Sequence, residues 1–102
     1  MTYRVTARHL EAKIETLNKL LGRPVAPWTR KASGPGMTAN IGNFHLSGAY
    51  GGVSLHEMTT DGGGIRDVFR CGHVPKRELA GLIDAYMQRI YDEQSERRER
   101  AA

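Results

Sequence analysis

The middle of the chain reads TANIGNFHL (38–46), SGAYGG (47–52), VSLHEMT (53–59), TDGGG (60–64) and IRDVFRC (65–71), and this succession decides the fold. The first, third and fifth segments are strand-like runs. The segments between them are rich in glycine, which adopts the positive φ angles of hairpin loops at little cost. Connections this short force neighbouring strands to be antiparallel. The sequence therefore predicts an antiparallel meander.

The predicted strand 53–59 has two different faces, because side chains alternate along a strand. Val53 and Leu55 point to one side, and His56 and Met58 point to the other.

A fourth, short edge strand is predicted at 28–31, with 37–46 as its partner. Pro27 precedes it, and proline is tolerated in a sheet at a strand start or an edge. The residues Ala32-Ser33-Gly34-Pro35-Gly36 form a turn signal between the two. Gly42 lies inside the first predicted strand, where glycine is typical of a bulge or a close backbone approach.

Residues 6–21 are predicted to form a helix before the meander. Their apolar residues recur at steps of four, three and four positions and so share one stripe: Leu10, Ile14, Leu17 and Leu21. Thr6 can cap the start of this helix by accepting a backbone N–H bond. Gly22 supplies the left-handed residue that commonly ends a helix.

Residues 75–91 are predicted to form a second helix after the meander, with Pro75 at its first position. Its apolar stripe consists of Leu79, Leu82, Ile83, Tyr86 and Ile90. The remaining segment, 92–102, is charged and polar up to the final alanines. We expect a frayed or solvent-exposed polar helical tail there.

These elements predict an α+β fold in a two-layer sandwich. An N-terminal helix, an antiparallel meander of three to four strands and a C-terminal helix follow one another, and the two apolar stripes cover one sheet face. A chain of 102 residues fits a single domain, 1–102.

Composition indicates a cytoplasmic protein. No apolar run approaches the roughly 20 residues that a membrane span needs, and the first residues do not have the pattern of a secretory signal. One cysteine, Cys71, allows no internal disulfide, which favours a reducing compartment. The net charge of +4 is uneven, because residues 1–38 hold seven Lys or Arg and two acids. This local excess of positive charge is suited to binding phosphate groups or an acidic protein surface.

No motif predicts catalysis or a metal site. Cys71 and His73 lack the paired ligand spacing of zinc sites. Gly72 separates them, so a nucleophile–base pair is not expected. The run Gly62-Gly63-Gly64 lacks the Gly-Lys-Ser/Thr ending of a phosphate loop and precedes a strand. We expect no enzymatic activity, no catalytic residue, no metal and no cofactor.

The candidate binding residues are an exposed aromatic and several basic side chains with aromatic neighbours. Trp28 with Arg30 and Lys31 is suited to stacking and phosphate contact, although a lone tryptophan is often a core anchor. Tyr50 is expected at a hairpin tip, as a contact residue. The remaining candidates lie where a helix N-terminus favours an anion: His73, Lys76 and Arg77.

The order helix, antiparallel strands, helix is also that of the double-stranded RNA-binding domain, in which basic residues at the start of the last helix grip phosphates. Here Lys76 and Arg77 match that feature. The match is one of topology alone, because Glu78 follows and the family's last helix is rich in lysine and alanine.

The chain also resembles a group of short proteins of unassigned function encoded by tailed bacteriophages. The resemblance covers roughly residues 8–90 and rests on three segments: 39–52, 62–64 and 71–79. It implies a phage product in a bacterial host cytoplasm and transfers no catalytic residue.

These features predict a small, non-enzymatic phage accessory protein that binds a host or phage macromolecule. A protein partner is the leading expectation. Nucleic acid bound through the basic residues and a small anionic nucleotide are the alternatives. A homodimer is also expected to be possible, since small domains with an open sheet edge often pair.

Overall fold

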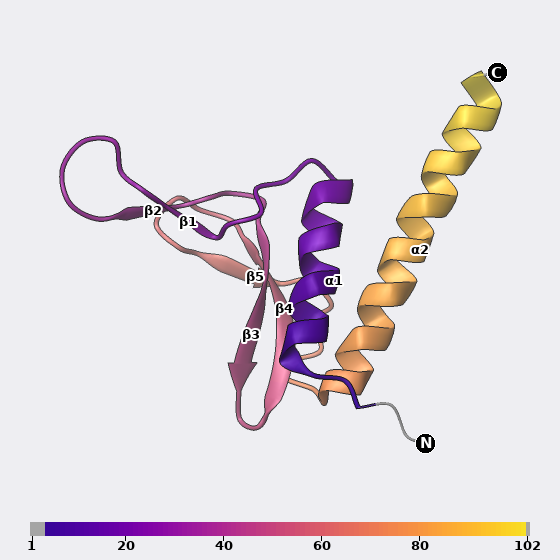
Figure 1. Ribbon diagram of the computed structural model, residues 1–102, viewed down its shortest axis with the longest axis horizontal. Helices are drawn as coiled ribbons and strands as arrows, with labels where there is room; N and C mark the ends of the chain where they lie inside the picture. The colour runs from indigo at the N-terminus through magenta and orange to yellow at the C-terminus, as the bar shows by residue number, and fades with distance from the viewer. Residues whose placement is uncertain (1–3, 102) are drawn as a thin grey trace.

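The computed structural model of this chain describes residues 4–101 and contains two helices and five short strands (Figure 1). In chain order these are α1 (Ala7–Leu20), β1 (Trp28–Arg30), β2 (Met37–Ala39), β3 (Phe44–Ala49), β4 (Gly52–Met58), β5 (Ile65–Asp67) and α2 (Lys76–Ala101). The α+β class and the helix–strands–helix order are confirmed. The extreme ends of the expected domain and tail, residues 1–3 and 102, lie outside the described residues.

The strands form two small antiparallel sheets instead of one continuous meander. One sheet has the order β3-β4-β5, and the other is the pair β1-β2. The predicted strand 38–46 is divided because Gly42 has a φ of +92°. Its N–H donates to the carbonyl of Met58, while the N–H of Met58 donates to the carbonyl of Asn43. Two residues thus face one, which is the bulge expected at Gly42 and which separates β2 from β3.

The predicted strand 65–71 is also shorter in the structure and ends at Asp67. The Asp67 carboxylate accepts hydrogen bonds from the backbone N–H groups of Arg70 (3.1 Å) and Gly72 (2.9 Å). Arg70 has a φ of 54°, outside the β region. The chain therefore turns away from the sheet after Asp67, and this turn directs residues 68–74 towards α2.

Helix α1 has the predicted start and end. The Thr6 hydroxyl accepts the backbone N–H of His9 at 3.3 Å, and the His9 ring lies 3.4 Å from the Thr6 N–H in a capping box. Gly22, with a φ of +66°, follows the last turn. The predicted stripe is buried at Leu10, Ile14 and Leu17.

Helix α2 begins at Lys76, one residue later than predicted, because the Pro75 carbonyl accepts the first helical bond from Leu79. It continues to Ala101, through the segment expected to be a frayed or solvent-exposed helical tail, and its second half extends beyond α1 (Figure 1). Exposed i,i+4 pairs such as Arg89–Glu93 follow its surface. Each such pair stabilises a helix by about 0.2–0.5 kcal/mol. Within residues 4–101, neither helix has the length and apolar content to cross a membrane.

Both helices pack on the same face of β3-β4-β5, and α1 also packs on α2 (Figure 1). The buried cluster between them consists of Leu10, Ile14, Leu17, Phe44, Val53, Leu55, Leu79, Ala80 and Ile83. Tyr86 of α2 meets Phe44 and Phe69 edge to face, with ring centroids 6.5 and 5.8 Å apart. The predicted layer of helices on strands is therefore present, and it leaves the other face of this sheet without a helix.

Candidate binding surfaces

The sheet face that carries no helix is polar from the β3–β4 hairpin to His56 and continues into the apolar pair Met58 and Ile65. We call its polar part the histidine face. It is formed by His45 and Ser47 of β3, Ser54 and His56 of β4, Asp67 of β5, and His73 from the segment before α2. His45 lies directly opposite His56 across the β3–β4 pair, and His56 lies opposite Asp67. The alternation predicted for 53–59 is thus confirmed, because Val53 and Leu55 are in the core on the other side.

Four rings follow one another across the histidine face and end at the β3–β4 hairpin. The ring centroids are 5.9 Å apart from His45 to His56, 6.0 Å from His56 to His73, and 6.1 Å from His73 to Tyr50. Each pair meets edge to face. These contacts join residues from two strands, a turn and the segment before α2 into one row of rings.

Burial holds the histidine pair in its neutral form. Partial burial lowers the pKa of His45, and the neighbouring His56 lowers it further. Burial also lowers the pKa of His56, although Asp67 opposes this shift and His73 adds to it. Both imidazoles are therefore uncharged near neutral pH, and they are able to contact apolar or π surfaces of a ligand.

Asp67 anchors one side of the histidine face. Burial alone would raise the pKa of its carboxyl, but the hydrogen bonds from the backbone N–H groups of Gly72 and Arg70 help to lower it below its ordinary value. The hydroxyl of Ser54 is buried and makes no well-formed hydrogen bond with the residues that the structure describes. The histidine face thus combines the ionised carboxylate of Asp67 with the neutral imidazoles of His45 and His56.

Tyr50 occupies the first central position of a two-residue hairpin turn. Ala49 pairs with Gly52, and the residues between them, Tyr50 and Gly51, have φ angles of 53° and 75°. Positive φ at both positions defines a type I′ turn, which favours Asn-Gly or Asp-Gly. Tyr50 is 99% exposed, so the strain that this backbone conformation imposes on a bulky residue is not offset by burial.

The hairpin that carries Tyr50 is fixed to the start of α2. Val53 and Val74 exchange two backbone hydrogen bonds, both 2.8 Å long. A Cβ atom added at Gly52 would lie 2.9 Å from the His73 carbonyl carbon, so the two segments are in close contact. The Tyr50 and His73 rings are in contact, and the start of α2 lies beside the β3–β4 hairpin (Figure 1). Four of the predicted residues therefore belong to one region, which we call the Tyr50 end: Tyr50, His73, Lys76 and Arg77.

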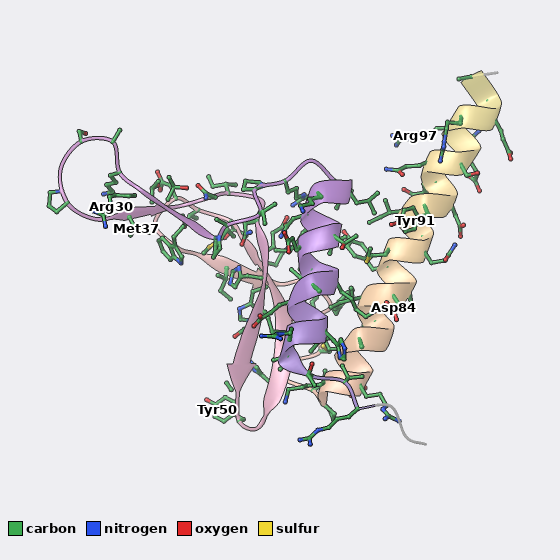
Figure 2. The ribbon with its side chains drawn as sticks, viewed as in Figure 1. Arg30, Met37, Tyr50, Asp84, Tyr91 and Arg97 are labelled. Atoms are coloured by element: carbon green, nitrogen blue, oxygen red, sulfur yellow. The ribbon has the colours of Figure 1, made fainter. Side chains whose placement is uncertain are left out.

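The other three predicted residues lie on the β1–β2 arm, residues 28–39. Trp28 is 41% exposed, with its ring edge against Gly63 of the β4–β5 loop, so it is neither a core anchor nor fully on the surface. Arg30 and Lys31 are exposed towards the tip of the arm. Figure 2 shows Arg30 and Tyr50 at different ends of the molecule. The seven predicted residues therefore form two separate groups.

The described residues show neither the geometry of a nucleophile–base pair nor that of a metal site. The Ser47 hydroxyl lies 3.4 Å from Nε2 of His73, which exceeds the roughly 2.6–3.2 Å typical of a nucleophile and its base. Burial, followed by Asp67, raises the pKa of the exposed Cys71 thiol and so disfavours its thiolate. Across residues 4–101, no group of three His, Cys, Asp or Glu side chains could hold a metal ion.

The sequence did not indicate that His45, His56, Ser54 and Asp67 form one surface. The signal was available in the alternation of β3 and β4, which leaves polar residues on one face. Comparisons with protein-family models, curated proteins and solved structures find no match for this chain.

Proposed function

We propose that this chain is a small phage-encoded accessory protein that acts in the cytoplasm of a bacterial host by binding another macromolecule, without catalysing a reaction. The observation that carries the proposal is Tyr50. It is almost fully exposed, and it stands where a type I′ turn favours asparagine, aspartate or glycine. A residue that costs stability without being buried is typical of a functional contact.

The surroundings of Tyr50 favour a single-stranded nucleic acid as the macromolecule. Bases of single strands stack on aromatic side chains, histidine included, and their phosphates contact basic side chains. The row from His45 to Tyr50 supplies the rings, with centroid separations of 5.9–6.1 Å. Lys76 and Arg77, which follow His73 closely in the chain at the start of α2, supply positive charge near the Tyr50 end of that row.

The test is fluorescence anisotropy with labelled single-stranded DNA and RNA at about 50 mM salt, followed by a salt titration. Two phosphate contacts, from Lys76 and Arg77, predict a slope of about −1.4 for the logarithm of the binding constant against that of salt. The variant Lys76→Gln/Arg77→Gln should bind weakly and lose most of this slope. The matched control, Arg30→Gln/Lys31→Gln, removes the same charge from the β1–β2 arm and should bind nearly as the wild type does.

Tyr50→Asn provides the second variant, because it removes the ring and suits the turn. Its affinity should fall by about 1–3 kcal/mol, the contribution of one stacked base. Equal weakening by both double charge variants would show general attraction by net charge and would contradict the proposed site. If the protein binds no single-stranded DNA or RNA, nucleic acid is excluded as its partner. A protein captured from host lysate by the wild type but not by Tyr50→Asn would then support a protein partner at the same end.

A further inference from the structure

The outer edge of β3 is only partly closed. In the β3–β4 ladder the residues at 45, 47 and 49 bond towards β4, so the N–H and C=O groups at 44, 46 and 48 point to the outer edge. At Phe44 these groups are taken by the buried side chain of Asn18, whose amide accepts from the N–H at 2.8 Å and donates to the carbonyl at 2.9 Å. Leu46 and Gly48 continue this edge towards the hairpin.

A groove runs beside this edge, between α1 and the segment that precedes β1. Its volume is about 340 Å³, and its lining includes Glu11, Ile14, Glu15, Val25, Pro27 and Leu46. The far wall is held in place by Asn43, whose side-chain amide donates to the carbonyls of Pro24 (2.8 Å) and Val25 (3.0 Å). The groove therefore combines a sheet edge, an apolar floor and a fixed wall.

We propose that this α1–β3 groove binds an extended, lysine- or arginine-bearing segment of a partner protein, which adds to β3 as a further strand. Strand addition takes its affinity from backbone hydrogen bonds and its specificity from pockets for alternate side chains. Leu46 and Gly48 supply the backbone groups. Ile14, Val25 and Leu46 supply the apolar contacts.

The charge of the groove selects a basic segment. Residues 1–38 contain two acids, Glu11 and Glu15, and both of them line this groove. The Lys19 ammonium forms an ion pair with the Glu15 carboxylate, with an N–O distance of 3.2 Å. Both side chains are at least half exposed, and exposed pairs of this kind are weak enough for Glu15 to bind another cation instead. No lysine or arginine is among the residues that line the groove.

The same charges disfavour a second copy of this chain in the groove. A twofold pairing of β3 with β3 would place both α1 helices on one side of the joined sheet. Glu11 and Glu15 of one copy would then approach those of the other, and facing like charges are destabilising. A basic strand from a different protein makes favourable pairs with the same carboxylates.

The test uses two labelled peptides of about eight residues, one alternating valine with lysine and the other alternating valine with glutamate. We expect the lysine peptide to bind roughly tenfold more tightly than the glutamate peptide. Its lysines form two exposed ion pairs with Glu11 and Glu15, whereas the glutamates of the other peptide would be repelled by the same two carboxylates. In ¹⁵N NMR spectra the amides of Leu46 and Gly48 should shift and their hydrogen exchange should slow. The amides of the second half of α2, such as those of Glu96 and Glu99, should not respond because they lie away from the groove.

Two variants locate the contact. Glu11→Lys/Glu15→Lys should lose about tenfold in affinity for the lysine peptide and gain affinity for the glutamate peptide. The control Glu96→Lys/Glu99→Lys makes the same change of net charge on α2, away from the groove, and should bind as the wild type does. Gly48→Pro removes an outward N–H without touching the bonds to β4, and should weaken both peptides.

Three results would overturn the proposal. The lysine peptide does not bind, it binds as tightly to the double lysine variant as to the wild type, or light scattering shows a dimer that Gly48→Pro abolishes. The last outcome would show that the outer edge of β3 pairs with a second copy of this chain. If Gly48→Pro does not fold, the charge variants and the amide shifts decide the matter alone.

Discussion

The two faces of β3-β4-β5 are built from the same strands, yet they have opposite chemistry. On one face Phe44, Val53 and Leu55 are almost fully buried beneath the two helices. On the other, His45 and His56 lie in edge-to-face contact without a helix above them. At positions 44–45 and 55–56, neighbouring residues of one strand thus serve two different purposes, since alternation assigns Phe44 and Leu55 to the core and His45 and His56 to the partly exposed face.

This contrast separates stability from binding. Substitutions on the helix-covered face should reduce the free energy of unfolding, because they remove buried apolar contacts. Substitutions on the histidine face and at Tyr50 should change binding and pH dependence while they leave the fold largely intact. The following predictions test this separation, from the largest expected effect to the smallest.

Leu55→Ala should have the largest effect. Leu55 is fully buried, and truncation of such a residue costs about 2–5 kcal/mol through lost burial and the cavity left behind. His56→Ala, at the next position on the opposite face, should cost less than about 1 kcal/mol. Urea unfolding of both variants measures the difference. Similar losses for the two would show that the faces are not energetically distinct.

Gly52→Ala tests the link between the hairpin and α2. The added methyl group would lie 2.9–3.0 Å from the backbone of His73 and Val74, which cannot yield as a flexible side chain can. We expect a loss of about 1–3 kcal/mol in unfolding free energy. In Gly48→Ala, the control, the nearest atom is 3.9 Å from the new Cβ. Equal melting temperatures for the two variants would contradict the close contact.

The histidine pair should make stability depend on pH. His45 and His56 have pKa values lowered in the folded state, so the unfolded chain binds more protons between the folded value and the ordinary 6.5. Stability is therefore full above pH 6.5 and falls as the pH drops through the lowered pKa values. Asp67 and His73 face the same pair, and Asp67, with its own pKa lowered, stays charged in this range.

Melting temperatures at pH 7.5, 6.5 and 5.5 would measure this fall. His45→Asn/His56→Asn should flatten the profile, since it removes both groups that titrate. A wild-type curve that is flat over this range would mean that the pair does not resist protonation. The contrast between the two faces would then rest on burial alone.

Tyr50→Asn should have the smallest effect on stability, and in the favourable direction. Asparagine tolerates the positive φ of this position, so relief of strain should raise the unfolding free energy by about 0.5–1 kcal/mol. Tyr50→Phe keeps the strain and should melt as the wild type does. Calorimetry of both separates the backbone effect from loss of the ring. A less stable Tyr50→Asn would show that the ring stabilises the hairpin after all.

Local signals in the sequence predicted much of the fold. Thr6 and Gly22 bound α1, and the glycines at 51 and 62–64 lie in the predicted hairpin loops. The division of 38–46 was not predicted, because a glycine in a strand indicates a bulge but not a change of partner. The end of β5 also depends on a local contact, between the Asp67 carboxylate and later N–H groups, which alternation does not reveal.

The candidate surfaces were predicted less completely for a different reason. Tyr50 at a hairpin tip follows from its glycine neighbours, and its exposure agrees. His73 joins the row of rings only because Val53 pairs with Val74, a contact between residues distant in the sequence. The separation of Arg30 and Lys31 from Lys76 and Arg77 is likewise set by tertiary packing, so net charge alone could not place them.

The reciprocal Val53–Val74 bonds have a consequence for the kinetics of recognition. They hold the hairpin tip and the first turn of α2 in one geometry before any ligand arrives, so little backbone freedom remains to be lost on association. Encounter should then lead directly to the bound state in a single exponential phase whose rate rises linearly with ligand concentration. A preassembled surface of this kind favours rapid capture over slow adaptation.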